Sequence, residues 1–206
     1  ENGISNPRAV YNLYKPFEQT LVLEKGNVDT LQPSTTYRDN VTFEWVETFD
    51  DNAISMSKGF NNQITDSMQT VPFTNSNALS MGTGFSAGVI FPLNSNGLTW
   101  EVVSNQTFLV PKKGKDVYME MDIMSDINIT VGIIYVSQGR FAQTEVVTIF
   151  PTEGRYKKFY LNLVTETSPL DDDLEVQIFI GGSNFLRDDK QPKVFLDNIK
   201  LAFLGN

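Results

Sequence analysis

The chain has 206 residues, of which 40% are hydrophobic and 20% charged, with a formal net charge of −9. The negative charge and the scattered Lys and Arg residues argue against a nucleic-acid partner, because phosphate binding needs clustered basic side chains. The sequence contains no Cys and no His, which excludes Ser-His-Asp and Cys-His catalysis and the usual zinc, copper and haem sites. A site for a metal that is bound through oxygen atoms remains possible, and calcium is the first candidate.

Short alternating or β-branched runs predict strands along most of the chain. The expected strands are 17–24, 41–49, 54–60, 78–85, 87–93, 99–110, 117–124, 128–136, 145–150, 156–164, 174–181 and 193–204. Clusters of Gly, Asn, Asp and Pro separate them, and no segment shows the period of an amphipathic helix. Strands at this spacing predict an all-β fold, an antiparallel β-sandwich of the jelly-roll type.

The first forty residues differ from the rest in being polar and rich in turn-forming residues. We expect residues 1–40 to form an N-terminal extension or tether with one strand at Leu21–Leu23. Residues 41–206 then form the jelly-roll domain.

The strands at 117–124, 128–136, 156–164 and 174–181 each alternate aliphatic residues with polar or aromatic ones. Successive side chains of a strand point to opposite faces. If these strands lie in one sheet, its second face collects Tyr118, Glu120, Asp122, Asn128, Tyr160, Asn162, Gln177 and Phe179. Such a face is either an ordinary solvated surface or a sugar-binding surface, where rings stack on a pyranose and amides and carboxylates bond to its hydroxyls.

Other aromatic residues offer further candidates. Trp100 follows a turn at the entrance of a strand, where its ring can face solvent and contact a ligand. Tyr135 and Phe141 flank a predicted hairpin tip at 137–140 and are weaker candidates. Trp45 lies in an apolar strand, and we expect it in the core.

An enzyme without His or Cys could still hydrolyse glycosides with two carboxylates. Glu120 and Asp122 are two residues apart on one strand face, about 7 Å by strand rise, but any polar sheet face produces such a pair. Glu101, Glu145 and Glu175 are possible partners, and nothing in the sequence selects one of them. We therefore expect a protein without catalytic activity.

The last predicted strand contains the unusual pair Asp197-Asn198. Both residues are poor strand formers because their short polar side chains compete for backbone hydrogen bonds. The pair marks a bulge or a strand end, or else the carboxylate holds a ligand.

The segment FLDNIKL at 195–201 resembles the closing strand of carbohydrate-binding-module-like jelly rolls, also called galactose-binding-like domains, and ETFDD at 47–51 resembles their opening strand. The resemblance brackets residues 41 to 206. The middle of the chain is similar to surface lipoproteins of Bacteroidetes glycan-utilisation systems, through the segments VYMEMDI, NITVGIIYV and YKKFYLNLV.

This resemblance implies a structural calcium held by Asp197 with Asp50 or Asp51. It also implies export to a bacterial cell surface or periplasm, with any signal peptide already removed. Anchoring to the outer membrane would use a lipid on a Cys upstream of Glu1.

The function expected from these observations is non-catalytic binding of a poly- or oligosaccharide. The candidate ligand-binding residues are Tyr118, Glu120, Asp122, Tyr160, Asn162, Gln177 and Trp100. The alternatives are a structural or adhesive surface protein that binds another protein, and a glycoside hydrolase that uses paired carboxylates.

Overall fold

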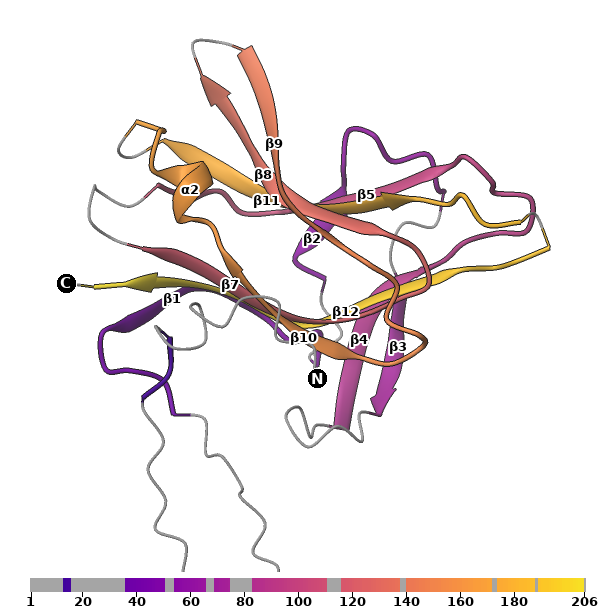
Figure 1. Ribbon diagram of the computed structural model, residues 1–206, viewed down its shortest axis with the longest axis horizontal. Helices are drawn as coiled ribbons and strands as arrows, with labels where there is room; N and C mark the ends of the chain where they lie inside the picture. The colour runs from indigo at the N-terminus through magenta and orange to yellow at the C-terminus, as the bar shows by residue number, and fades with distance from the viewer. Residues whose placement is uncertain are drawn as a thin grey trace, which may run out of the picture.

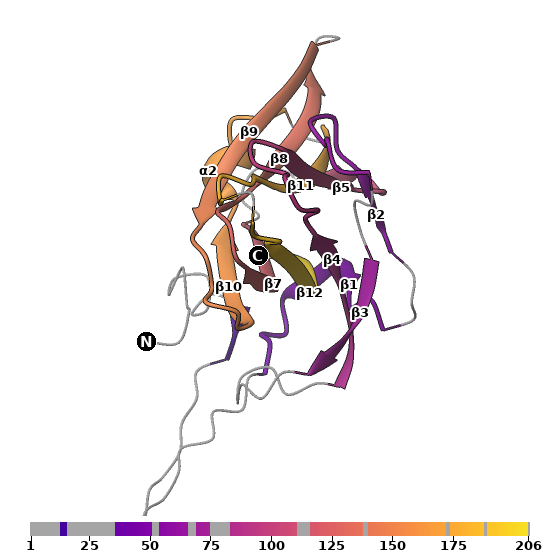
Figure 2. The ribbon, with the colours of Figure 1, turned by 90° about the vertical axis from the view of Figure 1, so that its right-hand side faces the viewer.

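A computed structural model describes residues 13–15, 36–50, 54–65, 69–74, 83–110, 116–137, 140–171, 174–187 and 189–205. The described strands form two antiparallel sheets that pack face to face, with one short helix (Figures 1 and 2). The predicted all-β jelly-roll sandwich is therefore confirmed.

The first sheet has the strand order β10-β7-β12-β4-β3, and β1 pairs with the second half of β12. Its strands are β1 (Val41–Glu47), β3 (Gln69–Thr74), β4 (Thr83–Ile90), β7 (Val117–Ser125), β10 (Lys157–Asn162) and β12 (Lys193–Leu204). The central strand β12 breaks its register with β7 between Asp197 and Lys200. Asn198 lies there with a positive φ of 49°, which Asn tolerates better than most residues. The pair Asp197-Asn198 thus marks a bulge, one of the two structural interpretations of the sequence.

The second sheet has the strand order β2-β5-β11-β8-β9, and the short β6 pairs with one end of β11. Its strands are β2 (Met56–Lys58), β5 (Thr99–Ser104), β6 (Phe108–Leu109), β8 (Ile129–Ser137), β9 (Arg140–Ile149) and β11 (Glu175–Ser183). The hairpin of β8 and β9 extends beyond the rest of the sandwich (Figure 1). The helix α2 (Val164–Thr167) follows β10.

Several strand boundaries differ from the sequence prediction. The expected strand 99–110 is divided into β5 and β6, and the expected strand 87–93 ends at Ile90 as part of β4. The strand β3 was not expected because Pro72 interrupts its pattern. Proline is accepted there because β3 lies at the edge of its sheet. The expected strand at 17–24 lies outside the described residues.

The core between the sheets is built from the aliphatic faces of the strands, as their alternation predicts. The largest fully buried side chains include Trp100, Phe49 and Phe91, and Trp45 is also buried as expected. Trp100 has 0% of its surface exposed, so the expectation that it faces solvent is wrong. Its position at the second residue of β5 points its ring inward, between the sheets.

Residues from the N-terminal part of the chain pack on the outer face of the first sheet. Leu13 is fully buried against Tyr118, Tyr160 and Ala202. Tyr14 forms an antiparallel bridge with Tyr37, and their rings stack at 4.6 Å. A face that would otherwise meet solvent is therefore covered by the chain itself.

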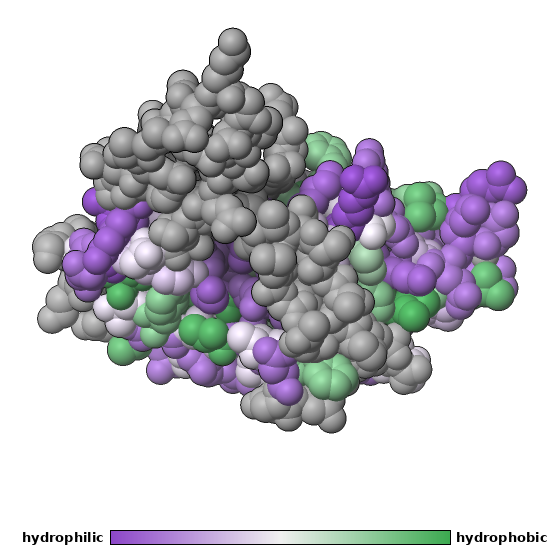
Figure 3. All heavy atoms as spheres, turned by 90° about the horizontal axis from the view of Figure 1, so that it is seen from below, coloured by the Kyte–Doolittle hydropathy of each residue, from purple (hydrophilic) through white to green (hydrophobic). Residues whose placement is uncertain are grey.

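From below, the described surface mixes hydrophilic and hydrophobic residues, and the hydrophobic ones are scattered in small spots (Figure 3). Scattered apolar residues of this kind are normal on a protein surface. Among the described residues, no helix is long and apolar enough to span a membrane.

Candidate functional site

The polar face expected from strand alternation is divided between the two sheets. Tyr118, Glu120, Asp122, Tyr160 and Asn162 lie on the first sheet, in β7 and β10. Asn128, Gln177 and Phe179 belong to the second sheet or its edge. The assumption that these residues share one face is therefore wrong.

Glu120 is buried on the outer face of the first sheet and is fully partnered. Its carboxylate accepts hydrogen bonds from the hydroxyls of Tyr14, at 2.5 Å, and Tyr37, and it forms an ion pair with Lys200 at 2.9 Å. Burial alone would raise the pKa of Glu120, but the charges of Lys200 and Lys158 and the tyrosine hydrogen bonds outweigh it, and the pKa is lowered. Glu120 thus holds the N-terminal residues on the sheet and does not face a ligand.

Asp122 and Asp197 form a second buried carboxylate cluster on this sheet. Asp122 pairs with Lys158 at 3.3 Å and accepts a hydrogen bond from Asn198 Nδ2 at 3.0 Å, while its Oδ1 has no hydrogen-bond partner among the described residues. Asp197 accepts hydrogen bonds from the backbone N–H and the side-chain amide of Asn198, at 2.7 and 3.0 Å. Burial raises the pKa of Asp197 to about 7; the charges of Asp122 and Asp50 act in the same direction, against the Asn198 backbone hydrogen bond.

Asp197 is the member of this cluster that was expected to hold calcium, together with Asp50 or Asp51. Asp50 Oδ1 accepts a hydrogen bond from the backbone N–H of Phe85, and Asp51 lies outside the described residues. Within the described ranges, no group of three acidic side chains is arranged to hold a metal. The calcium expectation therefore stays a prediction.

The contacts of the remaining candidate residues on the first sheet show that they stabilise the fold. Tyr118 and Tyr160 are buried under Leu13, and the Tyr118 hydroxyl donates a hydrogen bond to Asp116 at 3.0 Å. Asn162 accepts a hydrogen bond from the backbone N–H of Val164 at 2.9 Å and so fixes the turn into α2. The expectation that these residues form an open surface is corrected by the chain that covers them.

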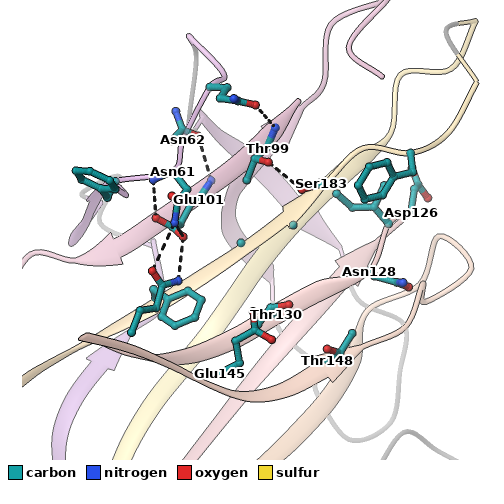
Figure 4. A pocket seen from close by; sticks show the side chains of 18 of the residues that line it. Asn61, Asn62, Thr99, Glu101, Asp126, Asn128, Thr130, Glu145, Thr148 and Ser183 are labelled. Carbon is teal, nitrogen blue, oxygen red and sulfur yellow. Dashed lines mark hydrogen bonds between the residues drawn. The ribbon is translucent and has the colours of Figure 1, made fainter. Parts of the chain in front are cut away.

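The open groove lies on the outer face of the second sheet, with a volume of about 820 Å³ (Figure 4). It is lined by Phe60, Asn61, Asn62, Gln63, Thr99, Glu101, Asp126, Ile127, Asn128, Thr130, Gln143, Glu145, Thr148, Pro151, Phe179, Gly181, Gly182, Ser183, Phe185 and Leu186. Amide, hydroxyl and carboxylate groups dominate this lining, and four phenylalanine and leucine side chains are interspersed among them. This volume falls within the usual range of small-molecule pockets.

Glu101 is the buried polar centre of the groove. It has 3% of its surface exposed, and its carboxylate accepts hydrogen bonds from the Asn61 backbone N–H at 3.0 Å, the Asn61 amide at 3.0 Å and the Gln143 amide at 3.2 Å. Asn62 accepts a hydrogen bond from the Glu101 backbone N–H at 3.0 Å. The residues after β2 are thereby fastened to β5 and β9 (Figure 4).

Two glycines make room for side chains that line the groove. A Cβ on Gly59 would lie 2.4 Å from Glu101 Oε1, so glycine leaves the space that the carboxylate occupies. A Cβ on Gly132 would lie 2.4 Å from Phe179 Cε1 and 2.2 Å from the Thr144 carbonyl oxygen. Phe179 is 2% exposed, and its ring occupies the space next to Gly132. The backbone can approach this closely only because both residues lack side chains.

Two exposed aromatic rings line the groove, Phe60 and Phe185, and Phe141 lies next to Phe60. Phe60 and Phe141 are 87% and 58% exposed, and their ring centroids lie 6.1 Å apart. Phe185 is 77% exposed and sits on a loop that is held in place, since Asn96 donates to the Leu186 carbonyl at 2.7 Å and Leu186 donates its N–H to Asn184. The rings are thus presented to solvent by fixed backbone.

A smaller hollow of about 330 Å³ adjoins Phe141 and is lined by Thr107, Ile134, Tyr135, Val136, Phe141, Leu174, Glu175 and Gln177. Gln177 donates a hydrogen bond to the Ser104 carbonyl at 2.6 Å and remains partly exposed. Several residues singled out in the sequence therefore line the groove or this hollow: Asn128, Phe179, Glu101 and Glu145 in the groove, and Tyr135, Phe141, Glu175 and Gln177 in the hollow.

No pattern in the sequence singles out Phe60, Asn61, Gln143 or Phe185. Phe60 and Asn61 follow a very short strand, and Phe185 lies in a loop, so neither has a period that predicts its direction. One feature of the sequence could have pointed to this groove: the charged residue Glu101 directly follows Trp100 in an apolar strand.

Comparison with family models gave no match, and comparison with curated protein sequences gave none. Among solved structures, the enzymatically active domain of bacteriophage CBA120 tailspike protein 4 is 13% identical with a TM-score of 0.44, over 81% of this chain and 20% of that one. A family 11 carbohydrate-binding module from Clostridium thermocellum, solved with a mixed-linked tetrasaccharide, is 16% identical with a TM-score of 0.46, over 77% and 95%. A module from Caldicellulosiruptor saccharolyticus, solved with mannohexaose, is 10% identical with a TM-score of 0.46, over 79% and 97%. The chain thus spans one fifth of the tailspike domain and nearly all of the two modules, and at these values none of their ligands carries over to it.

Proposed function

We propose that the groove on the second sheet binds a carbohydrate chain without catalysing its hydrolysis. The observation that carries this proposal is the combination of exposed rings and fixed hydrogen-bonding groups in one open groove. Phe60 lines the groove with Asn61, Gln143 and the buried Glu101, and the Phe141 ring lies 6.1 Å from the Phe60 ring in the adjacent hollow.

This combination matches the chemistry of a sugar. One face of a pyranose ring presents C–H groups, which pack on an aromatic ring, and its edges present hydroxyls that both donate and accept hydrogen bonds. The amide side chains Asn61, Asn62 and Gln143 offer both functions, and Glu101 accepts. Because Glu101 and its amide partners are already bonded to one another, little side-chain freedom is lost when a ligand binds.

The proposed contacts replace most of those expected from sequence. Tyr118, Tyr160 and Trp100 are buried and serve the fold. Of the expected residues, Gln177 stays a candidate, since it lines the hollow that adjoins the groove.

The test is a glycan-array and polysaccharide-gel screen of the purified protein, followed by calorimetry on any ligand found. Phe60→Ala and Phe141→Ala should each weaken binding, by about tenfold for one lost ring contact. Phe85→Ala is the matched control, because Phe85 is 37% exposed on the first sheet and should leave the affinity unchanged. A blank screen, or equal losses for all three variants, would remove the proposal and favour a protein-contacting role.

The absence of catalysis is tested with the same ligand. Prolonged incubation should release no shorter sugars. Release that stops in Glu101→Gln or Glu145→Gln, the two glutamates of the groove, would establish the hydrolase alternative instead.

Two sequence-based expectations stay predictions beside this proposal. Calcium at Asp50, Asp51 and Asp197 predicts a higher melting temperature in calcium than in a chelator, and an Asp197→Asn variant that lacks the difference. Export and lipid anchoring at a bacterial surface rest on the sequence resemblance, and labelling of intact cells with an antibody tests them.

A further inference from the structure

The groove carries negative charge and no positive charge among the described residues that line it. Glu101, Asp126 and Glu145 contribute carboxylates, and neither Lys nor Arg occurs in the lining. A ligand rich in uronic acid or sulfate would meet repulsion here, because like charges brought together in a partly dry site cost free energy.

Glu101 differs from the buried carboxylates on the outer face of the other sheet. Glu120 has Lys200 at 2.9 Å and Asp122 has Lys158 at 3.3 Å, so both are compensated by a cation of the protein. Glu101 is equally buried, yet only amide N–H groups from Asn61 and Gln143 surround it, and none of the described cations pairs with it. A buried carboxylate without a counter-charge is stabilised further when a ligand brings one.

The rings of the groove suit the same ligand. Phe60 precedes Asn61 in the chain, and Phe141 lies two residues before Gln143, so the exposed ring pair stands next to the two amide partners of Glu101. An ammonium group near an aromatic face gains a cation–π attraction in addition to its attraction to a carboxylate. A sugar ring on Phe60 and Phe141 would therefore place its substituents close to Glu101.

We propose that the groove selects glycans that carry free, protonated amino groups, such as chains of non-acetylated hexosamine, over neutral and acidic chains. This inference rests on the proposed carbohydrate-binding function and names the class of sugar. Glu101 is the specificity-determining residue, with Glu145 as a second, exposed carboxylate in the same groove.

The experiment compares four oligosaccharides of equal length by calorimetry: glucosamine, N-acetylglucosamine, glucose and glucuronic acid oligomers. The glucosamine oligomer should bind at least about tenfold more tightly than its acetylated and neutral counterparts. Its affinity should fall when sodium chloride is raised from about 50 mM to about 500 mM, since salt screens charge pairs. The glucuronic acid oligomer should not bind.

Variants separate a specific site from general attraction between a cationic chain and an acidic protein. Glu101→Gln should reduce glucosamine-oligomer binding about tenfold or more, whereas Glu44→Gln, an exposed charge on the first sheet, should not. If both variants bind like the original protein, the attraction is non-specific and the inference is overturned. The comparison of acetylated with free amines needs no variant and stands even if Glu101→Gln fails to fold.

The outcomes also separate the two proposals. Tight binding of a neutral, acetylated or acidic oligomer with weaker or equal binding of the amine overturns this inference and leaves carbohydrate binding intact. If no oligosaccharide of any class binds, the proposed function itself fails, and the inference fails with it.

Discussion

Asp122 and Asp197 are cross-strand partners, facing each other on β7 and β12 where the bulge of β12 begins. Among the described residues, Lys158 forms an ion pair with Asp122 and none with Asp197, so the charge of Asp122 helps to raise the pKa of Asp197. The bulge and the covered polar face are therefore one feature of the fold, and it responds to pH.

The pKa of Asp197, raised to about 7 chiefly by burial, predicts a pH-dependent stability. An unfolded Asp titrates near pH 4, so between about pH 4 and pH 7 the folded state binds the extra proton. Stability from this group is full below pH 4 and is lost as the pH rises through 7, with a slope of at most about 1.4 kcal/mol per pH unit. Urea denaturation of the protein and of Asp197→Asn from pH 4 to 8 should show that slope only in the original protein. An unchanged slope in the variant would contradict the assignment.

The contacts of Tyr37 and Lys200 with Glu120 hold N-terminal residues on the sheet and should contribute to the free energy of unfolding. Tyr37→Phe removes a hydrogen bond to a buried carboxylate, and should lower the free energy of unfolding by about 1–3 kcal/mol. Asp39→Asn is the control, because its pair with Lys15 is exposed and should contribute less than about 1 kcal/mol. Equal effects of the two substitutions in denaturant titrations would show that the hydrogen bond of Tyr37 to Glu120 stabilises the fold no more than an exposed ion pair does.

Burial predicts opposite phenotypes for two aromatic residues. Trp100→Ala empties a fully buried position and should cost about 3–5 kcal/mol of stability. Phe60→Ala removes an exposed ring and should change stability by no more than about 0.5 kcal/mol, while it weakens ligand binding. Thermal denaturation and calorimetry on the same samples check both. A stable Trp100→Ala protein would mean that the ring is outside the core.

The close packing of Gly59 against Glu101 allows a steric test of whether Glu101 belongs to the binding site. In Gly59→Ala the new Cβ would meet the carboxylate of Glu101 at 2.4 Å, so the side chain must leave its amide partners. Affinity for any ligand of the groove should fall about tenfold, with the circular dichroism spectrum unchanged. Gly205→Ala serves as the control, since its nearest atoms lie at ordinary contact distance. Full affinity in Gly59→Ala would remove Glu101 from the site.

The sequence predicted local features well and long-range ones poorly. The alternation in β7 and β10 predicted correctly which side chains leave the core, and a bulge was one of the alternatives that Asp197-Asn198 raised. Alternation is a property of one strand, and it says nothing about which strands are neighbours. Gln177 and Tyr160 therefore appeared to share a face, although they lie on different sheets.

The sequence also could not predict that N-terminal residues cover the outer face of the first sheet. Tyr14 and Tyr37 reach Glu120 from more than 80 residues away in the chain, and no periodic pattern encodes such a contact. The groove depends in the same way on Phe60 and Asn61, which lie in a turn. Turn residues have no alternation to predict the direction of their side chains.

The cover formed by Leu13, Tyr14 and Tyr37 has a practical consequence for anyone who prepares this protein. A shortened chain that starts at Val41 would uncover Tyr118, Tyr160 and Glu120, a group of rings and a carboxylate that looks like a sugar-binding platform. Such a protein would present a second, artificial adhesive surface, opposite the natural groove. Binding measured on the shortened chain and lost in the longer one would report that artefact.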